Sequence, residues 1–229
     1  MKNILVTGGS GKAGRATINL LLKKNYNVFN VDLANHSELD APFSKVNLEN
    51  FGDAIESVSE IDDRINGIDA IIHQAAIPAP GLETNHKTFR MNTLSTYNIF
   101  QAAKVLKINN IVWASSETVL GLPFDTYPPY VPVDEEYDPR PESSYSLSKV
   151  MGEEMARQYC RRNPEMKIFG LRYSNIMEEH DYKKFETFQK DPFLRKWNFW
   201  GYIDARDVAQ ACLLAMESKL RGAENFIIA

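Results

Sequence analysis

The sequence predicts an α/β fold with a doubly wound parallel sheet. Short apolar runs rich in β-branched residues alternate with amphipathic segments along the chain, a pattern typical of parallel strands joined by helices. The first run, residues 4–6, leads through a glycine-rich turn into an amphipathic segment at residues 15–24. The 229 residues suffice for one large domain with a full core. We therefore expect residues 1–229 to form a single domain.

The turn after the first predicted strand contains Gly8, Gly11 and Gly14. Glycines at a strand-to-helix turn permit unusual φ angles and let a pyrophosphate approach the backbone. The N-terminus of the following helix then offers N–H donors and the positive end of its dipole. An ordinary glycine-rich turn is the alternative, but the position between a strand and a helix favours a dinucleotide site.

The next predicted strand, residues 27–32, ends in Asp32. A carboxylate at this point accepts hydrogen bonds from an adenosine ribose. It also repels a ribose 2′-phosphate, so NAD is favoured over NADP, although Arg15 and His36 are nearby groups that would weaken this preference. The alternative is a solvated loop carboxylate.

The remaining elements follow the same alternation. Strands are expected at residues 44–48, 68–73, 110–115, 167–172 and 225–228. Helices are expected at residues 51–61, 85–107, 144–162 and 205–218. Two segments lack this pattern: residues 117–143, a proline-rich loop of a length typical of lids, and residues 174–204, an irregular aromatic and charged region on the substrate side.

Composition excludes several classes of function. A net charge of −4 without a basic patch argues against nucleic acid as a partner. No apolar run is long enough to span a bilayer, and no signal peptide precedes the first strand. Cys160 and Cys212 fall in helical patterns and suggest reduced thiols. We expect a cytoplasmic protein without a membrane partner. The four histidines lack ligand spacing, so no metal site is expected.

Three residues form a candidate for alcohol oxidation. Tyr145 and Lys149 share one helix face at i and i+4, where an ammonium is expected to lower the pKa of the phenol. The pair alone is weak, since a surface tyrosine beside a solvated lysine has the same spacing. Ser116 follows the fifth strand, and ligands of doubly wound sheets lie at such strand ends. A serine hydroxyl that positions a substrate oxygen beside a phenol that removes its proton suits this chemistry.

In these motifs the chain resembles the extended short-chain dehydrogenase/reductases, the NAD-dependent epimerase/dehydratase group, which have a Rossmann fold. The matching segments are residues 7–14, Asp32, 73–76, Asn92, 115–121, 145–149, 171–175 and 202–209. The resemblance implies a catalytic triad of Ser116, Tyr145 and Lys149. It also implies dimerisation through helices 85–107 and 144–162, so we expect a homodimer.

The resemblance further implies which residues contact the cofactor and the substrate. The cofactor contacts are Gly8, Gly11, Lys12, Ala13, Gly14, Asp32, Leu48, Ala75, Ala76, Asn92, Tyr145, Lys149, Tyr173 and Ser174. The substrate contacts are Glu117, Thr118, Asn175 and Lys184. The family pattern is broken at Asn47, often Asp; at Leu120, usually Tyr; and at Ser146, usually Gly.

The segment between Asn175 and Tyr202 is short compared with nucleotide-sugar enzymes of this group. This predicts a site for a small, non-nucleotide substrate, as in the similar uronate dehydrogenases, where a basic residue of the loop after the sixth strand holds the substrate carboxylate. The candidates here are Lys183, Lys184, Arg195 and Lys196, or else these form a solvated face.

Other side chains near this segment leave alternatives open. Glu117 would either repel an acidic substrate and accept hydrogen bonds from sugar hydroxyls, or point into solvent as a rim carboxylate. The aromatic residues Trp197, Phe199, Trp200 and Tyr202 favour a packed cluster over a sugar-stacking platform.

Three functions remain from the sequence. The first is an NAD-dependent oxidoreductase acting on a hydroxyl or hemiacetal carbon of a small sugar or sugar acid. The second is a nucleotide-sugar 4-epimerase that retains its NAD. The third is a non-catalytic dinucleotide-binding sensor, which the intact Ser116, Tyr145 and Lys149 argue against, because a binder needs only the glycine-rich turn.

Overall fold

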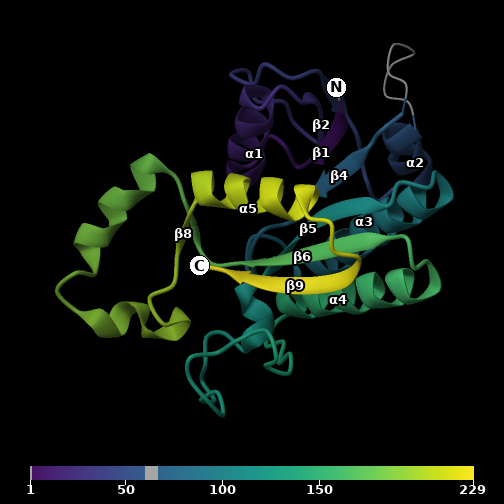
Figure 1. The fold of residues 1–229 in the computed structure, drawn as a ribbon. Coiled ribbons are helices and arrows are strands. Elements are labelled where there is room, and N and C mark those ends of the chain that lie inside the picture. The colour runs from purple at the N-terminus through teal and green to yellow at the C-terminus, as the bar shows by residue number, and fades with distance from the viewer. Residues whose placement is uncertain (1, 60–66) are drawn as a thin grey trace.

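The computed structural model describes residues 2–59 and 67–229. Its centre is a seven-stranded parallel sheet in the order β3-β2-β1-β4-β5-β6-β9, with a separate two-stranded pairing of β7 and β8 (Figure 1). The strands are β1 (Asn3–Thr7), β2 (Asn27–Asp32), β3 (Phe43–Lys45), β4 (Ala70–His73), β5 (Asn110–Ser116), β6 (Lys167–Tyr173), β7 (Ile176–Met177), β8 (Ile203–Asp204) and β9 (Gly222–Ile228). The predicted doubly wound sheet is therefore confirmed.

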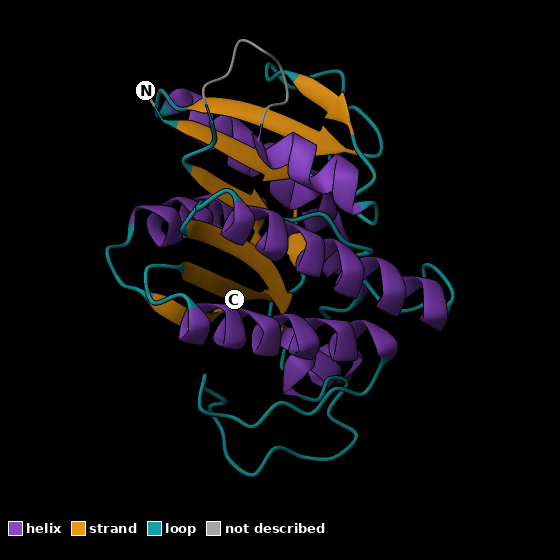
Figure 2. Cartoon of the chain, turned by 90° about the vertical axis from the view of Figure 1, so that its right-hand side faces the viewer, coloured by secondary structure: helices purple, strands orange, loops and turns teal. Residues whose placement is uncertain are grey.

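Helices cover both faces of the sheet. One face carries α1 and α5, and the other carries α2, α3 and α4 (Figures 1 and 2). The helices are α1 (Lys12–Lys23), α2 (Phe51–Ser59), α3 (Asn85–Val105), α4 (Ser144–Arg162) and α5 (Ala205–Glu217), with short 3₁₀ helices η1 (Glu117–Leu120), η2 (Glu179–Thr187) and η3 (Pro192–Asn198). Because both faces are covered, the central strands are buried and mostly apolar.

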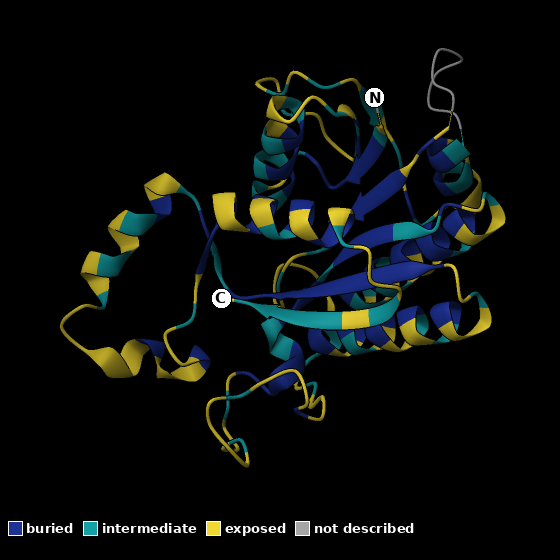
Figure 3. Ribbon diagram, in the orientation of Figure 1, coloured by how far each residue is buried: buried dark blue, intermediate teal, exposed yellow. Residues whose placement is uncertain are grey.

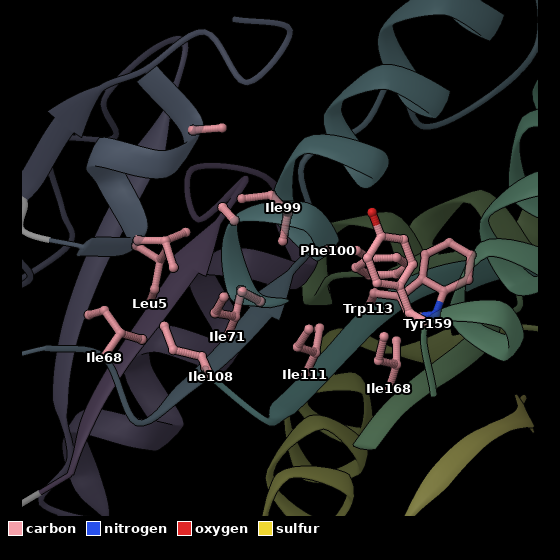
Figure 4. Close-up of a cluster of buried hydrophobic side chains, with 14 of the residues drawn as sticks. Leu5, Ile68, Ile71, Ile99, Phe100, Ile108, Ile111, Trp113, Tyr159 and Ile168 are labelled. Carbon is pink, nitrogen blue, oxygen red and sulfur yellow. The ribbon is translucent and has the colours of Figure 1, made fainter. Parts of the chain in front are cut away.

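The larger core fills the space between the sheet and helices α2, α3 and α4. Phe100 of α3 packs edge-to-face against Trp113 of β5 and against Tyr159 of α4, with ring centroids 6.0 Å apart in each pair (Figure 4). These contacts join α3, α4 and β5.

Several predicted elements differ in their bounds, among them the last strand, which is predicted at residues 225–228 and begins at Gly222. The third strand ends at Lys45, because the Asn47 side chain accepts a hydrogen bond from the N–H of Glu49 and turns the chain. The helix predicted at residues 51–61 is observed to Ser59, and residues 60 and 61 lie outside the described residues.

The segment from Glu178 to Gly201, here called the arm, contains η2 and η3 and loops away from the sheet (Figure 1). Most of its residues are exposed, in contrast to the buried strands (Figure 3). The arm returns to the body through β8, which pairs with β7.

Candidate active site

A cavity of about 1220 Å³ lies where the carboxyl ends of the strands meet. It is lined by every cofactor, catalytic and substrate contact predicted from the sequence except Lys184, and the other basic candidates Lys183, Arg195 and Lys196 are likewise absent from the lining. The lining residues drawn from that set are Gly8, Gly11, Lys12, Ala13, Gly14, Asp32, Leu48, Ala75, Ala76, Asn92, Ser116, Glu117, Thr118, Tyr145, Lys149, Tyr173, Ser174 and Asn175. The fold thus brings together residues from almost the whole length of the chain.

The glycine-rich turn forms a tight cradle at one end of this cavity. Gly8 has a φ of +69°, and a Cβ there would lie 2.5 Å from the backbone nitrogen of Ala75. A Cβ on Gly14 would lie 2.3 Å from the carbonyl oxygen of Gly8. Gly11 is the N-cap of α1 and brings no side chain to cover the helix N-terminus. These features fit the pyrophosphate of a dinucleotide, which needs close approach to backbone N–H groups.

The neighbouring part of the cavity suits an adenosine. Asp32 accepts hydrogen bonds from the N–H groups of Ser10 (3.0 Å) and Leu33 (2.7 Å), which hold its carboxylate at the cavity wall. Asn92 bonds both the N–H and the carbonyl of Ile77, which fixes the small-residue loop after β4. The chain therefore has an acidic group where a ribose is expected.

The three catalytic candidates come from two regular elements. Ser116 ends β5, and its Oγ accepts hydrogen bonds from the N–H (3.2 Å) and the hydroxyl (3.0 Å) of Thr118. Tyr145 and Lys149 lie in the first turns of α4 and are both buried. Helix α4 starts with a capping box between Ser143 and Ser146. The serine that replaces the usual glycine therefore fixes where α4 begins.

The prediction that Lys149 lowers the pKa of the Tyr145 phenol is wrong for the protein by itself. Burial, and to a smaller extent the charge of Glu117, raises the pKa of Tyr145 to about 12, although the Ser116 hydroxyl acts in the opposite direction. The Lys149 Nζ donates to the carbonyl of Ala114 (2.8 Å) and lies 5.6 Å from the centre of the Tyr145 ring. Burial also lowers the pKa of Lys149 to about 8. Desolvation thus outweighs the expected effect of the ammonium on the phenol.

A buried ion pair that the sequence analysis missed supports this region. Arg172 of β6 donates two hydrogen bonds, each 2.9 Å, to the carboxylate of Glu153 on α4. Ser115 of β5 donates a third to the same carboxylate, at 2.6 Å. The sequence contained two signals for this pair. Glu153 follows Lys149 by one helical turn, and Arg172 is a charged residue in a mostly apolar strand. The pair joins β5, β6 and α4 directly behind the catalytic candidates.

Glu117 lines the cavity instead of pointing into solvent. Burial raises its pKa to about 7, against the effects of the Ser174 and Asn198 side chains and the charge of Arg195. A Cβ on Gly201 would lie 3.4 Å from its Oε2, so a glycine leaves room for the carboxylate at the base of the arm. Of the two alternatives for Glu117, the cavity position is the observed one.

The structure does not bring Lys184 into the cavity. Its Nζ donates to Oδ1 of Asp181 at 2.6 Å, and Lys12 pairs with the other oxygen of that carboxylate. In the next turn of α1, Arg15 pairs with Glu178. The pairs of Lys12 and Arg15 fasten the start of the arm to α1, and Asp181 holds the Lys184 ammonium outside the cavity.

The other basic and aromatic candidates do not form one group in the structure. Arg195 is buried and donates to the carbonyl of Gly201 (2.8 Å), and the Lys196 Nζ lies over the Tyr127 ring. Of the four aromatic residues predicted as one cluster, Trp197 lines the cavity, while Phe199 stacks on Phe124 and Tyr202 packs against Tyr182 and Phe185.

Glu178, His180 and Asp181 have ligand-type atoms within 4.8 Å of one another. Two of these residues already form ion pairs with Arg15, Lys12 and Lys184. The expectation that the chain has no metal site stays a prediction. Among the described helices, none has the length and apolar character needed to cross a membrane.

Comparison with known proteins agrees with this geometry. The model of the NAD dependent epimerase/dehydratase family matches residues 4–229. The chain belongs to this family. The resemblance noted from the sequence motifs is thereby confirmed.

Relatives of this family member include both epimerases and a dehydrogenase. It is 31% identical over 194 residues to the bifunctional UDP-glucose 4-epimerase and UDP-xylose 4-epimerase 3 of Arabidopsis thaliana, covering 79% of this chain and 54% of that one. It is 32% identical over 242 residues to a putative UDP-glucose 4-epimerase of Methanocaldococcus jannaschii (94% and 74%). It is 26% identical over 228 residues to the L-arabinose 1-dehydrogenase (NAD(P)(+)) of Haloferax volcanii (96% and 84%). The chain spans about half the length of the Arabidopsis relative.

Solved structures share the fold. UDP-glucose 4-epimerase from Bifidobacterium longum in complex with NAD+ and UDP superposes with a TM-score of 0.80 at 21% identity, over 100% of this chain and 78% of that one. A mutated uronate dehydrogenase gives a TM-score of 0.76 at 22% identity, over 100% and 74%. Neighbours solved with NAD bound support a nicotinamide cofactor for the family fold.

Proposed function

We propose that the protein is an NAD-dependent oxidoreductase that transfers hydride between NAD and a hydroxyl or hemiacetal carbon of a small sugar or sugar acid. The observation that carries this proposal is that Ser116, Tyr145 and Lys149 line the same cavity as the glycine cradle and Asp32. A protein that only bound a dinucleotide would need the cradle without the other three groups.

Each catalytic candidate has a distinct role in this proposal. Tyr145 is the general base that takes the proton of the reacting hydroxyl, and Ser116, held by Thr118, orients the oxygen of that hydroxyl. Lys149, anchored on Ala114, holds a ribose hydroxyl and keeps a positive charge beside the phenol. When bound, the oxidised nicotinamide ring would accept the hydride and add a positive charge that favours the phenolate.

The preference for NAD over NADP rests on Asp32. Its carboxylate lines the cavity and is held by the N–H groups of Ser10 and Leu33, so a ribose 2′-phosphate would meet a fixed negative charge. Arg15, which was expected to weaken this preference, forms an ion pair with Glu178 instead.

A nucleotide-sugar 4-epimerase with retained NAD is the second candidate. It is favoured by the relatives, several of which are UDP-glucose 4-epimerases. The same groups would serve both reactions, because epimerisation adds return of the hydride to the opposite face of the sugar.

A substrate screen tests the proposal. The purified protein is mixed with NAD and with free aldoses, uronic acids or UDP-sugars, and the absorbance of reduced cofactor is followed. Accumulation of NADH with a free sugar or sugar acid supports the dehydrogenase. Interconversion of a UDP-sugar without accumulation of NADH supports the epimerase. If no compound gives either result, the proposal is contradicted.

We also propose a cytoplasmic homodimer. Leu94 and Tyr97 on α3, and Leu147 and Met151 on α4, are exposed apolar side chains on the two helices predicted to dimerise. The buried thiols of Cys160 and Cys212 suit a reducing compartment. Light scattering at micromolar concentration is expected to give the mass of two chains, and a monomer mass would contradict the dimer.

A further inference from the structure

Glu117 places a carboxyl group at the substrate end of the cavity. It is the first residue of η1, directly after Ser116, and its carboxylate is close enough to Tyr145 to raise the pKa of that phenol. On its other side lie Ser174, Asn198 and Gly201 at the base of the arm. The carboxylate therefore stands between the proposed general base and the segment that closes the substrate side.

The cationic side chains of this region are engaged by other groups of the protein. Of the described residues that line the cavity, the cationic ones are Lys12 and Lys149. Lys12 pairs with Asp181 at the cradle, and Lys149 is held on the carbonyl of Ala114. Arg195 is absent from the lining, and its guanidinium is engaged by Gly201 and packs over the rings of Phe188 and Trp197. A substrate carboxylate placed here would meet a like charge and no available cation among these groups.

We propose that Glu117 is a specificity-determining residue that selects sugars with uncharged hydroxyl-bearing carbons near Tyr145 and rejects sugar acids. This inference rests on the proposed oxidoreductase function and narrows its substrate class to neutral sugars. A carboxylate accepts hydrogen bonds from vicinal hydroxyls, whereas a carboxylate substrate beside it is repelled and loses its hydration without compensation.

Ionisation of Glu117 makes the selection dependent on pH. The charged and titratable groups that act on it or respond to it are Tyr145 from α4 and Arg195 from η3. Glu117 has a pKa of about 7, and Lys149, which lines the same cavity, has a pKa of about 8, so both change charge across neutral pH. The part of the pH dependence that Glu117→Gln removes belongs to Glu117. Rejection of sugar acids is expected to strengthen from pH 6 to pH 8.

The test compares matched neutral and acidic sugars, glucose with glucuronate and galactose with galacturonate. The kcat/KM of each is measured with NAD for the unchanged protein, for Glu117→Gln and for Glu179→Gln. Glu179 is an exposed carboxylate of the same region, so Glu179→Gln controls for a general loss of negative charge. Binding of each sugar to the protein saturated with NADH is measured by calorimetry, which gives a readout independent of turnover.

The expected result is that the neutral sugar of an active pair is preferred by at least about tenfold at pH 8, since a like-charge contact costs well over the free energy of one tenfold step. Glu117→Gln is expected to reduce that ratio, mainly through a lower KM and tighter binding for the acid, and Glu179→Gln is expected to leave the ratio unchanged. Equal or better use of the acid by the unchanged protein, or an unchanged ratio in Glu117→Gln, overturns the inference. Absence of turnover with every sugar overturns the proposed function itself.

Discussion

The catalytic candidates and the arm differ in how the chain holds them. Ser116, Tyr145 and Lys149 stand on β5 and α4, two regular elements joined behind the site by the buried pair of Arg172 and Glu153. The arm has no sheet or α-helix of its own between Glu178 and Gly201 and is fastened to α1 by ion pairs of Lys12 and Arg15, whose side chains are partly exposed.

This difference separates two tasks of one cavity. Proton transfer needs groups fixed to fractions of an ångström, and regular elements with buried neighbours supply that precision. Selection of a substrate needs a surface that can change without unfolding the core, and irregular segments tolerate such change. Tyr145→Phe and Glu153→Gln perturb the regular elements, Asp181→Asn perturbs the arm, and Glu117→Gln changes the group that lies between them.

The largest effect is expected for Tyr145→Phe. Loss of the phenol oxygen removes the proposed general base and should lower kcat roughly 10²- to 10⁴-fold. Affinity for NAD, measured by calorimetry, should change little, because the cradle is untouched. Tyr130→Phe, in the exposed loop, is the matched control and should keep full activity. Full turnover in Tyr145→Phe would contradict the catalytic assignment.

Glu153→Gln tests the support behind the catalytic candidates. The change leaves Arg172 buried without a counter-charge and should lower the free energy of unfolding by roughly 3–5 kcal/mol. Urea unfolding monitored by circular dichroism measures this. The exposed pair of Lys87 and Glu83 provides a control, since Glu83→Gln should cost at most about 1 kcal/mol. Equal losses for both changes would remove the contrast between buried and exposed pairs.

Asp181→Asn tests the fastening of the arm. The side chain of Asp181 is 1% exposed, and the ammonium groups of Lys12 and Lys184 hold its pKa well below the usual range. Because the folded pKa is lowered, its stabilisation is present above the unfolded value near 4 and is lost as pH falls. At pH 7 the variant should lose about 1–3 kcal/mol and be cleaved faster within the arm by a protease. Unchanged cleavage would show that these pairs do not hold the arm.

Glu117→Gln should change the free energy of unfolding in the opposite direction. Burial raises the folded pKa of Glu117 to about 7, so the protonated carboxyl favours the folded state. This contribution to stability is fully present below the unfolded pKa of 4.5 and is lost as pH rises through 7. At pH 8 the variant should be more stable by about 1–3 kcal/mol, and at pH 4.5 the two proteins should be equal. Urea unfolding at both pH values checks this, and a variant that is less stable at pH 8 would argue against a buried charge.

The fold could be predicted in detail because its signals are local. Strand β1, the glycines at positions 8, 11 and 14, and Asp32 follow one another within a short stretch, and each has a physical reason for its position. The spacing of Tyr145 and Lys149 likewise survives in any α-helix. Lys184 illustrates the opposite case. Its ammonium pairs with Asp181, and that carboxylate is held in place by Lys12, which is distant in the chain.

By itself, the sequence determined the doubly wound sheet, the cradle and the set of groups at the carboxyl ends of the strands. Periodicity and glycine placement act through the backbone of a few adjacent residues, so these features can be read locally. Tertiary structure alone decided that burial raises the pKa of Tyr145, that Glu153 pairs with Arg172, and that Glu117 faces the cavity while Lys184 does not. Desolvation and ion pairing depend on residues distant in the chain, and only the folded protein brings those residues together.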